Sequence, residues 1–344
     1  MKRRNFIQNT SIATMGLITG TPVLNAMTSY KDAIIGHGTH KYKIDLNWGA
    51  LNANYYPVND CHEMVQDSKG RILLLTNNTK NNVIIYDKKG NLIETWGTDY
   101  PGAHGLTLKN ENGTDMLYIA DNVRNEVIKT TIDGKVAQIF SYPKESGKYP
   151  SKNQYIPTET AVADNGDVYI ADGYGEQYIM HYNAQGKLLN TFGGKGDADH
   201  QFYNAHGICI DNRDAANPTL LITARQQNKL KRFTMDGKYI NSIDLPGAFI
   251  CRPVIAGNHI YLATIWSGDG DEGSGFVSIL DENNTLISAP GGSAPSYENG
   301  KLNKMHQAIK IFHHPHDVCV DDDENLYVAQ WNSGKTYPIK LSRV

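Results

Sequence analysis

The sequence predicts an all-β protein whose strands form a six-bladed β-propeller. A unit of strand, turn, strand, turn, strand, Gly-centred turn and outer strand recurs along the chain, and "HGLTLKNENGTDMLYIADNVRNEVIKTTIDGKVAQIF" is a clear copy. Short β-branched and aromatic runs separated by Asp-Gly, Asn-Gly and Lys-Gly pairs are typical of strands joined by tight turns. Repeats of roughly 40–50 residues with four strands each indicate propeller blades.

Six units follow one another along the chain. Four are clear copies, the fifth is degenerate, and they open with "HEMVQDSKG", "HGLTLKNEN", "TETAVADNG", "HGICIDNRD", "RPVIAGNHI" and "HDVCVDDDEN". The sixth unit ends at Val344 with only three strands, whereas "YKIDLNWG" near the N-terminus resembles the outer strands of other units. We therefore expect residues 41–48 to close the last blade, which removes a free sheet edge.

The first residues are typical of a targeting sequence. Arg3 and Arg4 precede Phe6, Ile7 and a modest apolar stretch, as in a twin-arginine export signal. We expect an export signal over residues 1–26, a linker over 27–40 and a single propeller over 41–344. The protein is thus predicted to be exported, to the periplasm or beyond the cell.

Charge and hydropathy argue against some kinds of binding partner. The net charge is −3 and no basic tract follows the leader, which argues against nucleic-acid binding. No segment of the mature chain is long and apolar enough to span a membrane. We expect a monomer that acts on a small molecule or an oligosaccharide.

The four cysteines do not form a disulfide framework and include no CxxC pair. Each lies an odd number of residues from the strand-initial position of its unit. Since side chains alternate along a strand, all four are expected to point away from the histidine side and to pack between blades. They are Cys61, Cys209, Cys251 and Cys319.

Three histidines occupy the same position in alternate units: His104, His206 and His316. In a closed ring of six, side chains from every second blade converge on the axis. Three imidazoles meeting at one level indicate a metal site with open coordination positions, and zinc suits it best.

Further histidines lie near this position. His62 has the equivalent place in the first unit, so it is either another channel residue or a general base. His313 and His314 precede the third ligand candidate, and His314 shares its face of the strand. His314 is therefore the better site candidate of the two.

A tyrosine and an arginine are suited to act beside such a metal. Tyr174 follows Gly173 just past a strand end, where its hydroxyl could reach over the channel. A nearby cation favours the phenolate, which could act as general base. Arg225 stands where other units have Asp121 or Asp172, so it is expected to hold a substrate carboxylate.

These residues resemble those of a known family. "HGLT", "ADGYG", His206 with the downstream Arg225, and "PHD" are similar to peptidyl-hydroxyglycine α-amidating lyase, a six-bladed propeller of the wider NHL-repeat group and the lyase half of peptidylglycine α-amidating monooxygenase. The resemblance covers the ring from about residue 41 to the end. It implies a catalytic zinc on the three alternate histidines, with Tyr174 and Arg225 acting beside it. It also implies a structural Ca²⁺ in the channel, bound by Asp317 and the backbone carbonyls of Met64 and Leu106.

The sequence departs from that family in its peptide-recognition part. Asn77 stands where the family has a second substrate-binding arginine, and His314 stands where it has a methionine before "PHD". No copper-monooxygenase partner domain is present in the sequence. The reaction type therefore transfers better than the substrate.

The preferred hypothesis is an exported zinc-dependent lyase or dehydratase that breaks a C–O bond by elimination, acting on a uronic-acid-containing oligosaccharide. Trp266 and Trp331 lie just after second strands, at the same rim as Tyr174, where indole faces could stack on sugars. Arg252 and Asn77 are further candidates for binding the substrate.

Three alternatives remain. One is a true peptidyl-hydroxyglycine lyase, and another is a non-catalytic NHL propeller that binds a partner at its rim. The third, a lactonase-like propeller, would need calcium ligands in a pattern that Glu63, Asn204 and Asp317 do not match.

Overall fold

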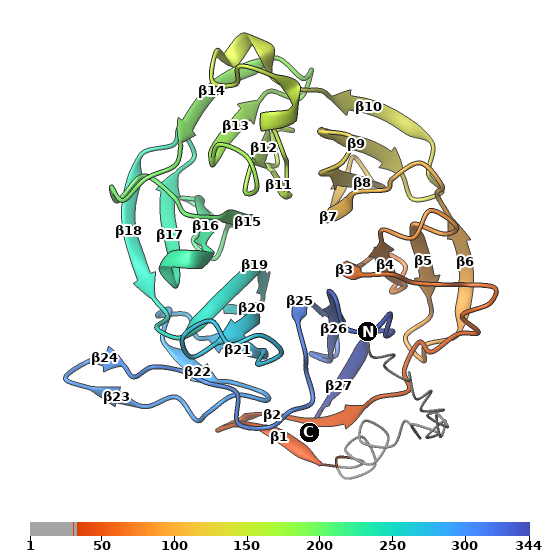
Figure 1. The fold of residues 1–344 in the computed structure, drawn as a ribbon, viewed down its shortest axis with the longest axis vertical. Coiled ribbons are helices and arrows are strands. Elements are labelled where there is room, and N and C mark those ends of the chain that lie inside the picture. Colours follow the sequence, from red (N-terminus) through yellow and green to blue (C-terminus); the bar gives the residue numbers. More distant parts are fainter. Residues whose placement is uncertain (1–29, 31–32) are drawn as a thin grey trace, which may run out of the picture.

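The computed structural model describes residue 30 and residues 33–344, which form a ring of six blades around a central channel (Figure 1). The predicted all-β propeller is confirmed: the described residues contain strands and three short 3₁₀ turns, and no α-helix. The expected export signal over residues 1–26 lies outside the described part of the chain. No helix in that described part is long and apolar enough to cross a membrane.

The first five blades are four-stranded antiparallel sheets whose strands follow in chain order from the channel outward. The first is β3 (Cys61–Gln66), β4 (Ile72–Thr76), β5 (Val83–Tyr86) and β6 (Leu92–Trp96), and the second is β7 (Ala103–Glu111), β8 (Thr114–Asp121), β9 (Glu126–Thr131) and β10 (Val136–Phe140). The third is β11 (Glu159–Val162), β12 (Val168–Ala171), β13 (Tyr178–Tyr182) and β14 (Leu188–Gly193). The fourth is β15 (Ala205–Asp211), β16 (Thr219–Ala224), β17 (Lys229–Thr234) and β18 (Tyr239–Asp244), and the fifth is β19 (Ala248–Ala256), β20 (His259–Ser267), β21 (Phe276–Leu280) and β22 (Leu286–Ser288).

The sixth blade joins the two ends of the described chain. Its inner strands are β25 (Pro315–Val320), β26 (Leu326–Gln330) and β27 (Ile339–Arg343), and β2 (His40–Asp45) pairs with β27. This is the closure expected of residues 41–48. β1 (Ile34–His37) adds a fifth strand that the sequence did not suggest, so the residues expected to be a linker enter the sheet.

Two smaller features decorate the ring. A hairpin of β23 (Tyr297–Glu298) and β24 (Lys301–Leu302) projects after the fifth blade (Figure 1). The 3₁₀ turns are η1 (Lys144–Ser146), η2 (Lys152–Gln154) and η3 (Arg225–Gln227), and η3 carries one of the predicted site residues.

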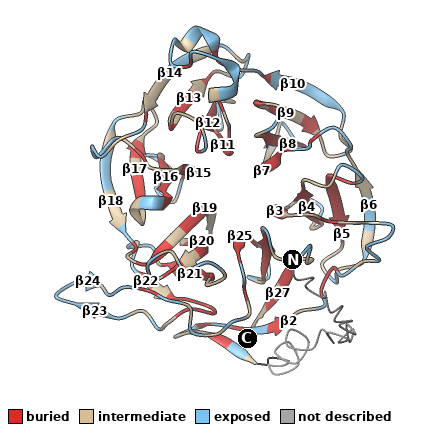
Figure 2. Ribbon diagram, viewed as in Figure 1, coloured by how far each residue is buried: buried red, intermediate tan, exposed pale blue. Residues whose placement is uncertain are grey.

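The core is divided among the six junctions between blades. Each of six hydrophobic clusters combines side chains from two neighbouring blades, for example Leu73 and Ile85 with Leu117 and Ile128. Inner and middle strands are buried on both faces, whereas outer strands are largely exposed (Figure 2). Burial on both faces explains why middle strands such as β4, "ILLLT", read as continuous apolar runs rather than alternating ones. This packing fixes the inner strands that line the channel.

Candidate metal centre

A β-bulge lies at each histidine that opens an inner strand. The pairing register of β3, β7, β15 and β25 with its neighbour shifts at the histidine, between Cys61 and Glu63, Ala103 and Gly105, Ala205 and Ile208, and Pro315 and Asp317. In a bulge two residues oppose one on the partner strand, which re-aims their side chains. Because of the bulge, the side chains of a histidine and of the residue after it can both point into the channel, at two successive heights along its axis.

Four histidines meet at the first of these levels, which we call the histidine layer: His62, His104, His206 and His316. The ring centroids of His104, His206 and His316 lie 4.7–4.9 Å apart, and His62 lies 4.8 Å from His104 and 4.9 Å from His316. The structure thus brings the three predicted ligands together and adds His62. All four side chains are at most 5% exposed.

Backbone carbonyls fix the tautomer of two of these histidines. His104 Nδ1 lies 2.9 Å from the carbonyl oxygen of Thr158, and His316 Nδ1 lies 3.0 Å from that of His62. A carbonyl only accepts, so Nδ1–H donates in both cases and Nε2 keeps its lone pair. This outer contact is the usual way in which a metal-binding imidazole is oriented.

The protonation and bonding of the layer fit a transition-metal ion. Burial holds the pKa of His62 at about 3 and the pKa of the other three well below the ordinary value, so all four imidazoles are neutral. Nitrogens of His62, His206 and His316 are buried without a hydrogen-bond partner. Candidate ligand atoms of His62, His104 and His316 lie within 4.8 Å of one another. Neutral nitrogen donors with unsatisfied lone pairs suit zinc or a similar ion.

The expectation for one cysteine was wrong. Cys251 was expected to point away from the histidines, but its sulfur lies within 4.8 Å of ligand atoms of His206 and His316. The register of β19 shifts between Ile250 and Pro253, so simple alternation fails there. Cys251 is thus a further potential ligand that alternation could not reveal.

The hydroxyl of Tyr174 contacts two histidines of the histidine layer. Its hydroxyl lies 3.0 Å from Nε2 of His104 and 3.0 Å from Nε2 of His206. The residue as a whole is 40% exposed, because only its hydroxyl end reaches into the channel. Burial raises the pKa of this hydroxyl, while the positive charge of Arg225 opposes the rise.

Glycines allow this approach. A Cβ on Gly173 would lie 2.4 Å from the carbonyl oxygen of Ala205, and one on Gly175 would lie 2.1 Å from that of Gln154. Both distances are far inside van der Waals contact. The "GYG" sequence is therefore required for the loop that carries Tyr174 to pack closely against the neighbouring chain.

Arg225 lies beside the same group, at the start of η3, and is only 3% exposed. Its Nη2 donates to the sulfur of Cys251 at 2.9 Å, and its Nε donates to the carbonyl oxygen of Ile250 at 3.3 Å. Its charge further lowers the pKa of His206, after burial. Arg225 thus places a buried positive charge between Tyr174 and the fifth blade.

His314, a predicted catalytic residue, has a structural environment instead. Its Nε2 accepts the backbone N–H of Gly273 at 3.0 Å, and its Nδ1 lies 3.2 Å from the carbonyl oxygen of Asn332. Both nitrogens are engaged by backbone, which leaves neither for proton transfer. One of the two contacts comes from Gly273, in the loop after β20.

The predicted substrate-binding residues differ in their surroundings. Trp266 and Trp331 pack against one small cluster that contains Cys251, at the rim of blades five and six. Asn77 is bound to Asp60 in both directions, through the backbone N–H of Asp60 at 3.0 Å and its carboxylate at 2.9 Å. The tryptophans are placed to border the channel mouth, whereas the amide of Asn77 is occupied.

Arg252 belongs to the next level of the channel, which we call the arginine layer: Arg252 with Glu63, Glu159 and Asp317. Its guanidinium donates from Nε and Nη2 to the two carboxylate oxygens of Asp317, at 3.1 and 2.8 Å. Glu63 and Glu159 lie 3.4 and 3.8 Å away. Arg252 was predicted to bind substrate; its guanidinium is paired with Asp317 here, and its side chain lines the cavity described below.

The same guanidinium excludes the expected calcium. Nη1 donates to the carbonyl oxygen of Leu106 at 2.7 Å, and Nη2 donates to that of Met64 at 3.0 Å. Together with Asp317, these are the three groups that were expected to hold Ca²⁺. The residues present therefore do not fit the ion. Sequence reasoning missed Glu63, Glu159 and Arg252 as a set, although "HE", "TE", "CR" and "HD" stand at equivalent positions in the first, third, fifth and sixth units.

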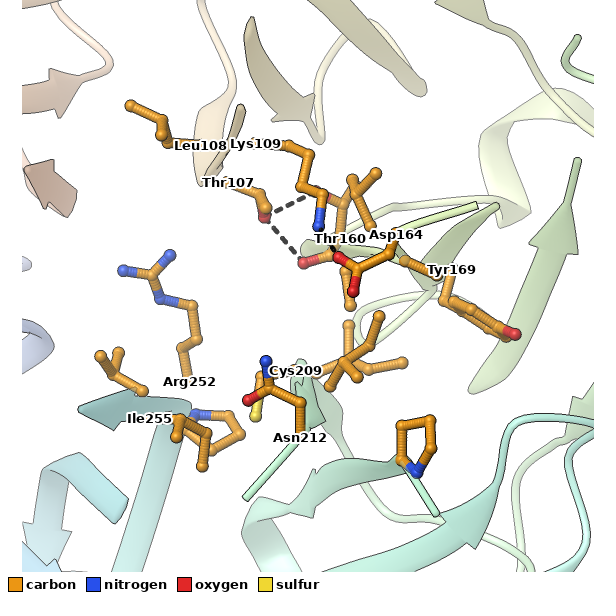
Figure 3. Close-up of a pocket in the computed structure, with 18 of the residues that line it drawn as sticks. Thr107, Leu108, Lys109, Thr160, Asp164, Tyr169, Cys209, Asn212, Arg252 and Ile255 are labelled. Atoms are coloured by element: carbon orange, nitrogen blue, oxygen red, sulfur yellow. Dashed lines mark hydrogen bonds and ion pairs between the residues drawn. The ribbon is translucent and has the colours of Figure 1, made fainter. Parts of the chain in front are cut away.

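A cavity of about 920 Å³ opens beyond the arginine layer, at the opposite end of the channel from Tyr174. It is lined by the later residues of the inner strands, including Thr107, Thr160 and Cys209. Figure 3 shows Arg252 extending from the fifth blade toward this space, with Lys109 paired to Asp164 near its edge. Arg252 thus separates the cavity from the histidine layer.

The chain is similar to peptidyl-α-hydroxyglycine α-amidating lyases. It is 34% identical to lyase 1 of Drosophila melanogaster over 110 residues, 29% of this chain and 19% of that protein, and 33% identical to a probable lyase of Caenorhabditis elegans over 111 residues, 31% and 30% of the two chains. The NHL repeat-containing protein 3 of Homo sapiens is 21% identical over 253 residues, 64% of this chain and 71% of that one. No family model matches, and the chain spans under a third of the length of these two lyases.

Solved structures share the fold. A streptogramin B lyase superposes with a TM-score of 0.55 at 15% identity, covering 83% of this chain and 94% of that one. A gluconolactonase from Xanthomonas campestris superposes with a TM-score of 0.56 at 12% identity, covering 92% of each chain. At such identities the likeness concerns architecture alone.

Proposed function

We propose that this protein is a metal-dependent lyase of the amidating-lyase type, which acts on a hydroxyl group next to a carboxylate. The observation that carries the proposal is the position of the Tyr174 hydroxyl, 3.0 Å from both His104 and His206 and next to the buried Arg225. A proton-transfer group, a neutral nitrogen ligand set and a fixed cation meet there. The similarity to lyases in flies and nematodes supports the same reaction class.

The residues divide the work as follows. The alternate histidines His104, His206 and His316 would hold the metal, and bound zinc acts as a Lewis acid on a substrate oxygen. Tyr174 Oη takes the proton of the substrate hydroxyl, in the phenolate form that neighbouring positive charge favours. Arg225 supplies part of that charge, and its remaining N–H groups can bind the substrate carboxylate.

On an N-acyl-α-hydroxyglycine the step balances without a further reactant. The hydroxyl proton moves to Tyr174 Oη, the oxygen electron pair forms the carbonyl of glyoxylate, and the C–N bond breaks. The nitrogen then takes the same proton from Tyr174 Oη and leaves as the amide. Nothing is oxidised or reduced.

Glyoxylate release tests the proposal directly. Zinc-loaded protein is incubated with a short N-acyl-α-hydroxyglycine, and glyoxylate is measured against the same protein stripped of metal. Release that depends on metal and is lost in Tyr174→Phe supports the lyase. A protein that binds one equivalent of metal yet releases no glyoxylate excludes this substrate class.

A second candidate substrate is an oligosaccharide that contains uronic acid. Trp266 and Trp331, which border the same cluster at the channel mouth, favour it because indole faces stack on sugar rings. A uronate offers a carboxylate for Arg225 and an acidic C5 proton for Tyr174. The test is the ultraviolet absorbance of an unsaturated uronate across a panel of such oligosaccharides, and its absence throughout the panel rules this substrate out.

Export, action as a monomer and the choice of zinc are parts of the same proposal. N-terminal sequencing of the exported protein should find a new terminus near residue 27, and size-exclusion chromatography should give the mass of one chain. A non-catalytic propeller, the remaining alternative, would carry no stoichiometric metal.

A further inference from the structure

The centre of the channel contains the positively charged guanidinium of Arg252. The three carboxylates of the arginine layer belong to Glu63, Glu159 and Asp317, each at most 1% exposed. Buried carboxylates are stable only when they are paired or bound to a metal ion. Here one guanidinium lies within 3.8 Å of all three.

The acceptors of this guanidinium come from three blades other than its own. Asp317 lies on β25, Leu106 on β7 and Met64 on β3, whereas Arg252 itself lies on β19. Two carbonyls and a bidentate carboxylate use the fork geometry of the guanidinium, which a lysine could not match. The interaction therefore ties the ring together across its axis.

The same oxygens form a donor set of the kind that calcium prefers. Ca²⁺ takes six to eight oxygens from carboxylates, backbone carbonyls and water. Asp317, Glu63 and Glu159 with the carbonyls of Met64 and Leu106 would supply most of them. Glu159 Oε2 is already without a hydrogen-bond partner.

Close packing fixes the backbone of Arg252 against the fourth blade. A Cβ on Gly207 would lie 2.5 Å from the Cα of Arg252, so the fourth blade contributes only a glycine at this level. The backbone of Arg252 therefore lies against the fourth blade while its side chain crosses the channel. A metal ion and this side chain cannot share the site.

We propose that Arg252 is a built-in replacement for a structural calcium ion, which positions the inner strands of the histidine layer without any bound calcium. Each of its acceptors lies within two residues of a histidine of that layer: Met64 follows His62, Leu106 follows His104, and Asp317 follows His316. The inference is independent of the proposed reaction, because it concerns only the second level of the channel.

The experiment compares calcium responses of the wild-type protein and Arg252→Ala. Both are stripped with chelator, reloaded with zinc so that only calcium differs, and unfolded by urea with and without added Ca²⁺. The wild-type protein should show no calcium response. Arg252→Ala should be less stable without calcium and regain stability with it: at calcium 100 times Kd, its unfolding equilibrium constant should fall about 100-fold.

Arg213→Ala is the matched control. Arg213 is also partly buried and paired with a carboxylate, that of Asp211 at 2.7 Å, but it lies away from the channel. This variant should lose stability and show no calcium response. A general effect of calcium on damaged protein would appear here as well.

Two results would overturn the proposal. One is a stoichiometric calcium ion, or a calcium response, in the wild-type protein. The other is an Arg252→Ala variant that folds but neither binds calcium nor responds to it. If Arg252→Ala is insoluble without calcium and soluble when expressed and purified with it, the proposal is supported; if it is insoluble in both, the calcium content of the wild-type protein decides.

Discussion

The histidine layer and the arginine layer lie at successive levels of the channel, and Glu63 and Asp317 directly follow His62 and His316, yet the bonding of the two layers differs. In the first, nitrogens of His62, His206 and His316 are buried without partners. In the second, the guanidinium of Arg252 bonds to a carboxylate and two carbonyls. The second layer has one such atom, Glu159 Oε2, against three in the first. Because unsatisfied buried polar atoms are costly, the first layer is the one built to receive a ligand from outside. The side chain of Arg252 occupies the oxygen ligands of the second layer, so that only the histidine layer is free to bind an ion.

Removal of one histidine should have the largest effect. We expect His206→Ala to lose bound transition metal and at least about 100-fold in activity, because even outer-shell changes at metal sites cost 10–100-fold. Bound metal is measured by elemental analysis and turnover by product release. His181→Ala is the control, since His181 is paired with Asp167 on the third blade. Full metal content in His206→Ala would contradict the assignment of this layer.

Removal of the Tyr174 hydroxyl separates chemistry from metal binding. Tyr174→Phe should keep its metal and lose about 10²–10⁴-fold in kcat, the usual contribution of a positioned acid–base group. Stability should change little, because the residue is 40% exposed. A variant with unchanged kcat would show that another group transfers the proton.

A substitution in the arginine layer should lower the free energy of unfolding. Asp317→Asn leaves the buried charge of Arg252 without its bidentate partner, so we expect a loss of about 3–5 kcal/mol in the free energy of unfolding. The control is Asp322→Asn, which removes an exposed carboxylate paired with Lys88 and should cost at most about 1 kcal/mol. Equal losses in urea unfolding would mean that the layer is not a special source of stability.

An ion-pair cluster outside the channel should give the smallest effect, confined to acid. Burial alone would raise the pKa of Asp211, but hydrogen bonds from Arg213 and Arg232 hold it at about 2, below the ordinary 3.8. The ionised form therefore stabilises the folded protein above about pH 4, and this contribution is lost as the pH falls toward 2. Asp211→Asn should cost about 1–2 kcal/mol at pH 6 and progressively less in acid. A pH-independent difference in urea unfolding would contradict this.

Much of the fold could be predicted because it repeats. Turn pairs such as Asp-Gly and the shared "YIAD"-like strands set six units, and the resemblance of "YKIDLNWG" to other outer strands predicted the pairing of β2 with β27. β1 and the hairpin of β23 and β24 were missed, since neither belongs to the repeat. Comparison of repeated units predicts the strands that every unit contains, and it cannot predict strands that occur only once.

The site was predictable for a similar reason, and only in part. His104, His206 and His316 could be brought together from their equivalent positions. The direction of Cys251 could not, because the bulge in β19 breaks the alternation on which the expectation depended. The destination of Arg252 could not either, since its acceptors on β3, β7 and β25 are far away in the sequence.

Analysis of bound metals in the purified wild-type protein tests the central claim most directly. After purification without chelators, the account predicts about one equivalent of zinc or another transition metal per chain and no stoichiometric calcium. The first number tests the histidine layer and the second tests the arginine layer. Protein without a transition metal, or with an equivalent of calcium, would contradict the account.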